Sequence, residues 1–367
     1  MQSSSGDAGR RRYGRGGRWV ALGGALACLA GCGARDVQPT AESHSGGPGS
    51  TSPAPAGGPS APAASPSGSG APTGEAPPES AEGESCGELG CRVFDTPQQA
   101  LARVIAERPL ILGVGESHMQ KGSEGVRSAT SHFRDELLSR LAPLASDLVL
   151  ELWVVDPSCR KTAQGQKAVE KVAEQQKEVT KSQSAGNQNE FVALGNKAKS
   201  LGVVPHTLTP SCAQYDAIVK AQKPEDSVAA MLDMLTTLTS EKAQRLHKRN
   251  ADAGVGKMIV TYGGAMHNDL VPPKERAEWS FGAALQKASD GHYVELDIIV
   301  PELVKDTPSW RELPWYRHYD RTKHPGKTTL FNPSPGSYVL VFPAGGVADA
   351  PAASGAASAP PAATSAP

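Results

Sequence analysis

The sequence carries no excess of basic residues, because 37 Lys and Arg are balanced by 38 Asp and Glu to a formal net charge of −1. Proteins that bind nucleic acids normally show such an excess, so the charge balance argues against nucleic acid as a partner. No P-loop pattern, G-x-x-x-x-G-K-[ST], and no internal repeat occur either. The apolar run at residues 19–31 has 13 residues, which is too short for a transmembrane helix of about 20 residues.

What the sequence has in abundance is Gly and Pro, 39 and 30 residues, and their distribution divides the chain. Of the 53 residues from 33 to 85, 43 are Gly, Ala, Pro, Ser or Thr, and residues 344–367 have a similar composition. Such segments have too few large apolar side chains to offset an ordering cost of roughly 1–2 kcal/mol per residue. We therefore expect a disordered tether at 32–85, a disordered tail at 344–367, and one folded domain at 86–343.

The N-terminus has the pattern of a bacterial lipoprotein signal. Five Arg residues and one acid precede the apolar run, as in the basic and apolar regions of a signal peptide. The run ends Leu29-Ala30-Gly31-Cys32, which resembles a lipobox, in which a Leu and two small residues precede the cysteine to be lipidated. We expect 1–31 to be removed and Cys32 to anchor the chain in the cell envelope. Gly33 favours the outer membrane, by resemblance to lipoprotein sorting rules. The alternative is a plain secretory signal with a chance Cys.

Four further cysteines lie in the predicted domain: Cys86, Cys91, Cys159 and Cys212. An even number in an oxidising compartment indicates two disulfides, for which three pairings can be drawn. We favour Cys86–Cys91, a short loop at the start of the domain, and Cys159–Cys212. A structural zinc site would need two C-x-x-C-like pairs, and the second two cysteines supply none.

Short apolar runs alternate with helical patterns through the predicted domain. Thr96, Pro97 and Gln99 form a capping pattern at the start of a first helix. Runs typical of buried parallel strands lie at 110–114, 148–155, 203–206, 257–262, 294–300 and 337–342. Helices are expected at 125–142, 191–201, 224–250 and 281–287, and the polar stretch 161–182 is expected to be a solvated helix or an insertion. The alternation predicts a single α/β domain with a mainly parallel sheet flanked by helices.

Carboxylates and imidazoles gather where these strands end. Glu116 and His118 follow the first strand, and Glu151 interrupts the second. His267 follows the strand at 257–262. In open α/β sheets ligands bind beyond the carboxyl ends of the strands, so these four residues are the predicted catalytic or metal-ligating set. Two carboxylates and two imidazoles can hold a metal ion, or one group can act as a general acid and another as a general base in catalysis.

The residues at the strand ends also allow interpretations other than a functional site. His118 can be a capping residue, Glu151 can lie on an exposed edge, and His267 can belong to a turn. The runs Gly113–His118 and Gly115–Met119 lack a glycine that the dinucleotide fingerprint and the nucleophile elbow require. Tyr262 and His206, also at strand ends, are predicted to line the pocket or bind a cofactor. Gly113, Gly115, Gly263 and Gly264 are expected to permit unusual dihedrals at the strand-to-loop turns.

Taken together, G-E-x-H after a strand, a Glu in the next strand and G-x-x-H after a later strand resemble a known superfamily. It joins ChaN-type haem-binding lipoproteins, TraB/Tiki-type metalloproteases and erythromycin esterases, and the resemblance covers about residues 96–300. It implies that Glu116, His118, Glu151 and His267 face one pocket. The lipid anchor favours the ChaN-like branch.

These observations lead to three hypotheses. The first is a lipid-anchored protein of the bacterial cell envelope that binds haem or a divalent metal at the Glu/His cluster. The alternative is a hydrolase of the erythromycin esterase or Tiki type, in which Glu116 or Glu151 acts as base on water and the two imidazoles stabilise or protonate. The third is an envelope structural protein with a vestigial site. The expected partners are the membrane, through Cys32, and a small-molecule ligand or substrate.

Overall fold

The computed structural model describes residues 82–345 except 124 and 222. The predicted signal peptide 1–31, Cys32 and most of the tether and tail lie outside the described residues. Residues 84 and 85, which were expected to belong to the tether, instead form strand β1 (Glu84–Ser85). Within the described ranges, no helix is both long and apolar enough to cross a membrane.

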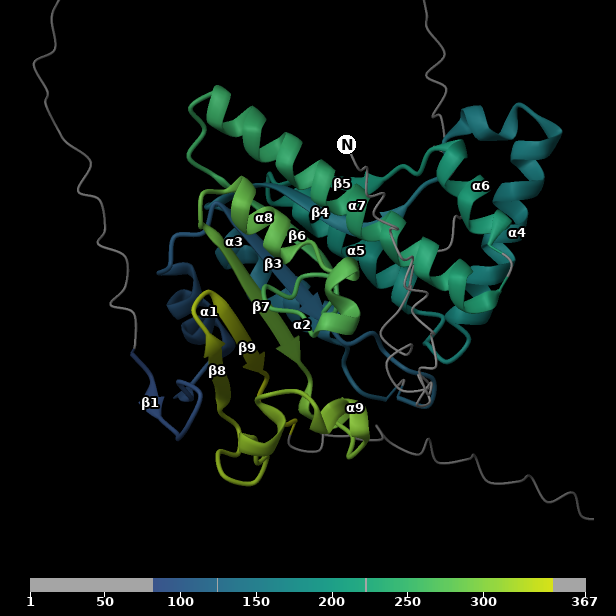
Figure 1. Cartoon of the computed structure of the whole chain (residues 1–367). Helices are drawn as coiled ribbons and strands as arrows, with labels where there is room; N and C mark the ends of the chain where they lie inside the picture. The colour runs from purple at the N-terminus through teal and green to yellow at the C-terminus, as the bar shows by residue number, and fades with distance from the viewer. Residues whose placement is uncertain (1–81, 124, 222, 346–367) are drawn as a thin grey trace, which may run out of the picture.

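The strands of the described chain form one nine-stranded sheet. Besides β1 they are β2 (Arg92–Phe94), β3 (Ile111–Glu116), β4 (Ala145–Trp153), β5 (Val204–Leu208), β6 (Met258–Gly264), β7 (Tyr293–Ile299), β8 (Thr328–Ser334) and β9 (Ser337–Val341). Their order is β1-β2-β8-β9-β7-β3-β6-β4-β5 (Figure 1). Neighbours from β9 to β5 are parallel, whereas β8, β2 and β1 add an antiparallel edge. The predicted α/β fold with a mainly parallel sheet is confirmed.

Helices cover both faces of this sheet. They are α1 (Pro97–Ile105), α2 (Ala129–His132), α3 (Leu138–Leu141), α4 (Ala163–Val179), α5 (Asn187–Ser200), α6 (Cys212–Lys220), α7 (Pro224–Asp252), α8 (Gly282–Ala288) and α9 (Pro308–Arg311). The side chains of a strand alternate between faces. On β3, Leu112 joins the core beneath α1, α2, α3 and α5, and Ile111 joins the core beneath α4, α6, α7 and α8. Figure 1 shows α7 and α8 in front of the sheet.

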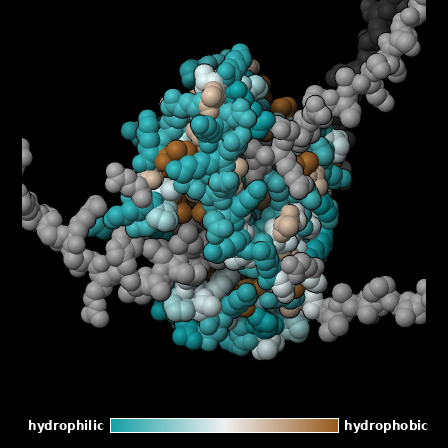
Figure 2. Space-filling view, turned by 90° about the vertical axis from the view of Figure 1, so that its right-hand side faces the viewer, coloured by the Kyte–Doolittle hydropathy of each residue, from teal (hydrophilic) through white to brown (hydrophobic). Residues whose placement is uncertain are grey.

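The local signals at the helix ends behave as expected. Thr96 accepts a hydrogen bond from the Gln99 backbone, and the Gln99 side chain accepts one from the Thr96 backbone, so the capping box is confirmed. The polar stretch 161–182 contains α4, a helix capped by Thr162. In Figure 1, α4 and α6 project to one side of the sheet, and the face seen from that side is mainly hydrophilic with small, separate apolar patches (Figure 2).

Other local expectations need correction. The helix expected at 125–142 is split, because the π-helical turn η2 (Phe133–Leu137) separates α2 from α3. The second part ends at Leu141, one residue before the expected end. Helix α6 and the antiparallel strands were not predicted.

Both predicted disulfides are confirmed. Cys86 pairs with Cys91 at a Cα–Cα distance of 5.1 Å, and Cys159 pairs with Cys212 at 5.2 Å. The second bridge joins the 3₁₀ turn η3 (Pro157–Arg160), which follows β4, to the first residue of α6. It therefore fastens the projecting helical layer to the strand that carries Glu151.

Candidate functional site

Glu116 and His118 form the first half of the site. Glu116 is the last residue of β3, and its side chain is buried at 2% exposure. Its Oε1 accepts a hydrogen bond from Nδ1 of His118 across 2.6 Å, and its Oε2 accepts one from the hydroxyl of Thr130 across 3.1 Å. The carboxylate thus holds the imidazole in one orientation.

That orientation leaves the second ring nitrogen of His118 available. The ring is 1% exposed, and its Nε2 has no hydrogen-bond partner among the described residues. Burial opposes a charge on the ring, but the hydrogen bond and charge of Glu116, together with the charge of Glu151, outweigh it and raise the pKa of His118. His118 is therefore both an oriented donor nitrogen and a group that accepts a proton readily.

Glu151 and His267 form the second half. Glu151 lies near the end of β4, and its Oε2 accepts a hydrogen bond from the backbone N–H of Gly264 across 2.6 Å. Nε2 of His267 lies 3.9 Å from Oε1 of Glu151. On its other side, Nδ1 of His267 lies 2.8 Å from the carbonyl oxygen of Trp279. A carbonyl only accepts, so Nδ1 carries a proton and Nε2 is the ring nitrogen that faces Glu151.

The two halves flank β6, which lies between β3 and β4 in the sheet. Glu116 contacts Thr130 of α2. Glu151 and His267, in contrast, share a cavity with residues of α7, and the charge of Glu151 acts on His118.

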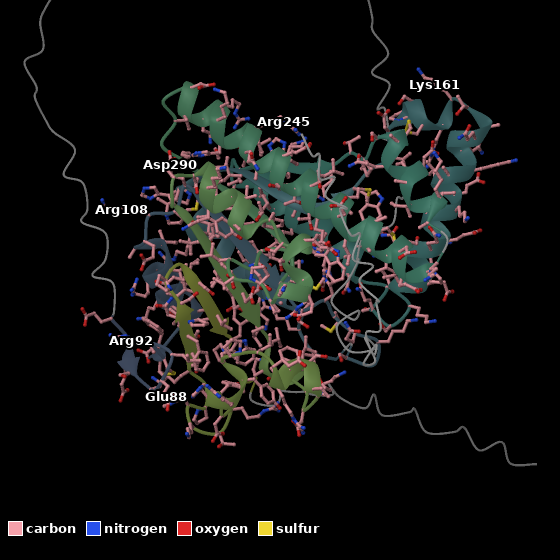
Figure 3. The ribbon with its side chains drawn as sticks, in the orientation of Figure 1. Glu88, Arg92, Arg108, Lys161, Arg245 and Asp290 are labelled. Atoms are coloured by element: carbon pink, nitrogen blue, oxygen red, sulfur yellow. A yellow bond between two sulfur atoms is a disulfide. The ribbon has the colours of Figure 1, made fainter. Side chains whose placement is uncertain are left out.

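Glu116 pairs in register with Gly264, whose N–H holds the carboxylate of Glu151. All four predicted residues therefore stand at the carboxyl ends of three adjacent strands. Arg108 and Asp290, labelled in Figure 3, lie just before β3 and β7 and therefore mark the amino ends of these strands, opposite the candidate site.

Tyr262 belongs to this site, as predicted from its place at a strand end. Its hydroxyl donates to Oγ1 of Thr130 across 3.2 Å, and burial raises its pKa well above the usual range. Tyr262 also lines a small cavity together with Glu151 and His267, and the space left there for the centre of a water molecule is about 10 Å³. Room of that size holds about one water molecule.

His206 does not join the cluster. Its position on β5 is level with Val149, two residues before Glu151 on the neighbouring strand, and its Nε2 lies 2.7 Å from Oδ1 of Asp147. Arg249 of α7 pairs with the other oxygen of the same carboxylate. The imidazole is therefore part of an ion-pair network nearer the start of β4, and the expectation that it binds a cofactor has no support from its position.

The glycines act differently from the expectation. Gly113, Gly115, Gly263 and Gly264 have no positive φ, so unusual dihedrals are not what they provide. They permit close approach instead. A Cβ on Gly263 would lie 2.2 Å from Oε2 of Glu151, and one on Gly115 would lie 2.4 Å from Oδ1 of Asn268. The absence of a side chain at Gly263 leaves the space that the carboxylate of Glu151 occupies.

A second group of carboxylates was not singled out from the sequence. Asp269, Glu295 and Asp297, here called the acidic triad, have ligand atoms that all lie within 4.8 Å of one another. Burial, helped by the charge of Glu295, raises the pKa of Asp269 to about 7. Burial also raises the pKa of Glu295 and, with the charges of the other two acids, raises that of Asp297 well above its usual range. The only signal in the sequence was an E-x-D pattern inside the apolar run 294–300.

A larger hollow of about 770 Å³ lies elsewhere, lined by the disulfide Cys86–Cys91 and by residues between Val304 and Lys323. None of the Glu/His cluster lines it. Its walls are polar and open, and no set of buried groups converges there comparable to the four at the strand ends. The cluster is therefore the stronger candidate site.

Comparison with known proteins adds little to this geometry. No family model matches the chain, and no curated protein matches it. Among solved structures, "The structure of the type III effector HopBA1" aligns over 70% of this chain and 98% of that chain, with 13% identity and a TM-score of 0.35. A similarity of this size carries no inference about function.

Proposed function

We propose that the Glu/His cluster binds a divalent metal ion. The observation that carries the proposal is the pair of buried imidazole nitrogens, Nε2 of His118 and Nε2 of His267, that have no hydrogen-bond partner among the described residues. Buried polar atoms in proteins are nearly always satisfied, so each of these nitrogens calls for a partner, which a bound metal ion would supply.

The donor types suit such an ion, although among the described residues the ligand atoms of the cluster are not drawn together within 4.8 Å as those of the acidic triad are. His118, His267 and Glu151 would supply two imidazole nitrogens and a carboxylate, a set used for zinc and other transition metals. Glu116 bonds the far nitrogen of His118, and the carbonyl of Trp279 accepts from the far nitrogen of His267. Partners of this kind orient metal-binding histidines and raise their basicity. A bound metal would lower the pKa of a coordinated water and polarise a carbonyl or phosphoryl group.

Haem fits this site less well. The cavity beside Glu151 and His267 has room for about one water molecule, which is far less than a porphyrin needs. Haem binding remains an expectation from the resemblance, and a haemin titration of the same protein tests it: a Soret shift at one equivalent of haemin would restore it.

A second candidate function, hydrolysis, is favoured by that same water-sized cavity. A water held there would lie beside Glu151, which is fixed by the Gly264 N–H and can accept its proton. His118, with its raised pKa, would supply a proton to a leaving group. Ester, lactone and peptide substrates test this function. We expect Glu151→Gln to reduce turnover about 10²–10⁴-fold, and activity that survives in Glu151→Gln/His267→Gln would exclude this site.

Metal binding is tested on the full chain in detergent. After chelator treatment and dialysis, Zn²⁺ is added and binding is followed by calorimetry. We expect one equivalent to bind, and His118→Gln/His267→Gln to weaken binding at least about 100-fold. The matched control is His292→Gln, because His292 is exposed and outside the cluster. Equal affinity in the double variant and the control would overturn the proposal.

We also propose that the protein works at the cell envelope, held by a lipid on Cys32. The support is the signal-like N-terminus with its lipobox-like end, and two disulfides, which are typical of oxidising compartments. Cys32→Ser should move the protein from the membrane fraction to the soluble fraction of a bacterial host. A variant that stays with the membrane would show that Cys32 is not the anchor.

A further inference from the structure

The acidic triad lies on the sheet face that carries α7 and α8, the face on which His267 also contacts Thr236 of α7. Glu295 and Asp297 are two residues apart on β7 and point to the same face. Asp269 comes from the loop after β6, which crosses this part of β7. One ligand oxygen from each residue lies within 4.8 Å of the other two.

The charge of Arg276 compensates Asp269 in part, because it opposes the rise in the pKa of that carboxyl. Glu295 accepts hydrogen bonds from the backbone N–H of Leu270 at 2.6 Å and the hydroxyl of Ser337 at 3.0 Å. Asp297 accepts one from the amide of Asn268 at 3.1 Å. No Lys, Arg or His in the described part of the chain forms an ion pair with any of the three. Glu295 is buried and the other two are partly buried, and gathering three such carboxylates is costly unless protons or a metal ion neutralise them.

A separate observation points to a metal ion rather than to protons alone. Asn268 is 1% exposed, and its Oδ1 has no hydrogen-bond partner among the described residues. Its Nδ2 donates to the carbonyl of Gly113 and to Asp297, and this fixes which way the amide faces. A Cβ on Gly115 would lie 2.4 Å from Oδ1 of Asn268 and 2.5 Å from Oδ1 of Asp297, so both oxygens converge over Gly115.

We infer that the acidic triad, together with the side-chain carbonyl of Asn268, binds Ca²⁺. Carboxylate and amide oxygens are hard ligands, which suit Ca²⁺, Mg²⁺ and Mn²⁺. Ligands on opposite sides of Ca²⁺ lie about 4.6–5.2 Å apart, because each Ca–O distance is about 2.3–2.6 Å. The ligand oxygens of the triad lie within 4.8 Å of one another, so one ion can contact all three. Ca²⁺ accepts six to eight oxygen ligands in flexible geometry, whereas Mg²⁺ demands a near-ideal octahedron and keeps several waters.

A Ca²⁺ ion bound to the acidic triad would connect the loop after β6, which carries His267, to strand β7. Asn268 and Asp269 directly follow His267, and Leu270 reaches Glu295 through its backbone N–H. An ion between this loop and β7 would hold the backbone that positions the His267 imidazole. The Ca²⁺ site is a structural support and stands whether or not the Glu/His cluster binds metal.

The inference is tested on the full chain in detergent after treatment with a chelator. CaCl₂ is added alone, and binding is measured by calorimetry and by thermal unfolding. We expect one equivalent to bind and Tm to rise by on the order of 5 °C at saturation. Asp297→Asn and Glu295→Gln should each bind Ca²⁺ at least about tenfold more weakly, while Asp233→Asn, an exposed acid on α7, behaves as the parent chain.

The variants also distinguish the loss of a metal site from the misfolding of the chain. Without Ca²⁺, Asp297→Asn should be at least as stable as the parent, because it removes a buried charge, and only the gain from Ca²⁺ should be lost. His118→Gln/His267→Gln should retain Ca²⁺ binding, so failure of the first site is distinguishable. The inference is overturned if the parent chain shows no Ca²⁺-dependent change while Asp297→Asn is more stable, since the triad then shares protons only. It is also overturned if Ca²⁺ binds equally to both triad variants.

Discussion

His118 donates a hydrogen bond from Nδ1 to Oε1 of Glu116 across 2.6 Å, and both side chains are buried. The bond connects the last residue of β3 to the loop beyond it. It orients the ring with Nε2 facing away from Glu116, and the negative charge makes that nitrogen more basic. Glu116 therefore acts through His118 as a positioning residue.

Replacing Glu116 by Gln tests this relationship. The amide keeps the shape and can still accept from Nδ1, but the charge is lost, so we expect affinity for Zn²⁺ to fall about 10–100-fold. The fraction of His118 that is protonated at neutral pH should also fall, because Glu116 raises the pKa of His118. Calorimetry measures the affinity, and NMR titration of the ring measures the pKa. Glu178→Gln, an exposed site on α4, is the control, and equal affinity in both variants would contradict the role.

Gly263 offers a test that leaves the charged groups in place. A Cβ there would lie 2.2 Å from Oε2 and 2.8 Å from Cβ of Glu151, so Gly263→Ala must displace the carboxylate or the strand. We expect a loss of about 1–3 kcal/mol of stability and a loss of metal binding. Gly256→Ala is the control, because nothing lies within 4 Å of a Cβ at Gly256 and its φ is not positive. Denaturant unfolding with a metal titration measures both effects. Unchanged binding in Gly263→Ala would mean that Glu151 is not a ligand.

The sequence predicted the parallel part of the sheet because continuous apolar runs such as Leu148–Leu150 are what a strand buried on both faces requires. The antiparallel edge was missed since β1 has two exposed residues and β2 only three residues in all, too short for any periodicity. The π-helical turn was missed because the adjacent residues Leu137 and Leu138 both pack into the same hydrophobic core. A pattern with a period of 3.6 residues does not place two neighbouring residues on one face.

The sequence predicted the part of the candidate site whose residues directly follow strands, because the carboxyl ends of parallel strands lie at the same end of the sheet. Glu116 and His267 stand where the end-of-strand rule put them. His206 was expected at a strand end but is the middle residue of β5, and the sequence carried no sign that Asp147, 59 residues away, would pair with it. Asp269 and Glu295 meet through the loop after β6, a long-range contact that no local pattern reveals.

The disulfide between Cys159 and Cys212 should matter more for stability than the one between Cys86 and Cys91. The first spans 53 residues of sequence and the second 5. Loop-closure entropy then suggests losses of about 4 and about 2 kcal/mol when each bridge is removed. Paired Cys→Ser variants, compared by denaturant unfolding, measure the difference. Equal losses, or a larger loss for Cys86→Ser/Cys91→Ser, would contradict the expectation.

Asp147 should make the fold sensitive to acid. Burial alone would raise its pKa, but hydrogen bonds from Ser146, His206 and Arg249 outweigh burial and lower it. A carboxyl whose pKa is lower in the folded chain than its unfolded value of about 3.9 stabilises the fold above that value. The contribution is lost as pH falls through the folded pKa.

Asp147→Asn should therefore cost about 1–3 kcal/mol near pH 7, since His206 and Arg249 lose a buried partner. The difference between parent and variant should narrow as pH falls below about 3.9, where the unfolded carboxyl binds a proton, and should vanish once pH falls through the folded pKa. Urea unfolding at pH 7, 5 and 3 measures the difference at each pH, and other titrating groups cancel in it. The control Asp233→Asn should stay within about 0.5 kcal/mol of the parent at every pH. A difference between Asp147→Asn and the parent that stays constant from pH 7 to 3 would show that the lowered pKa of Asp147 does not contribute to stability.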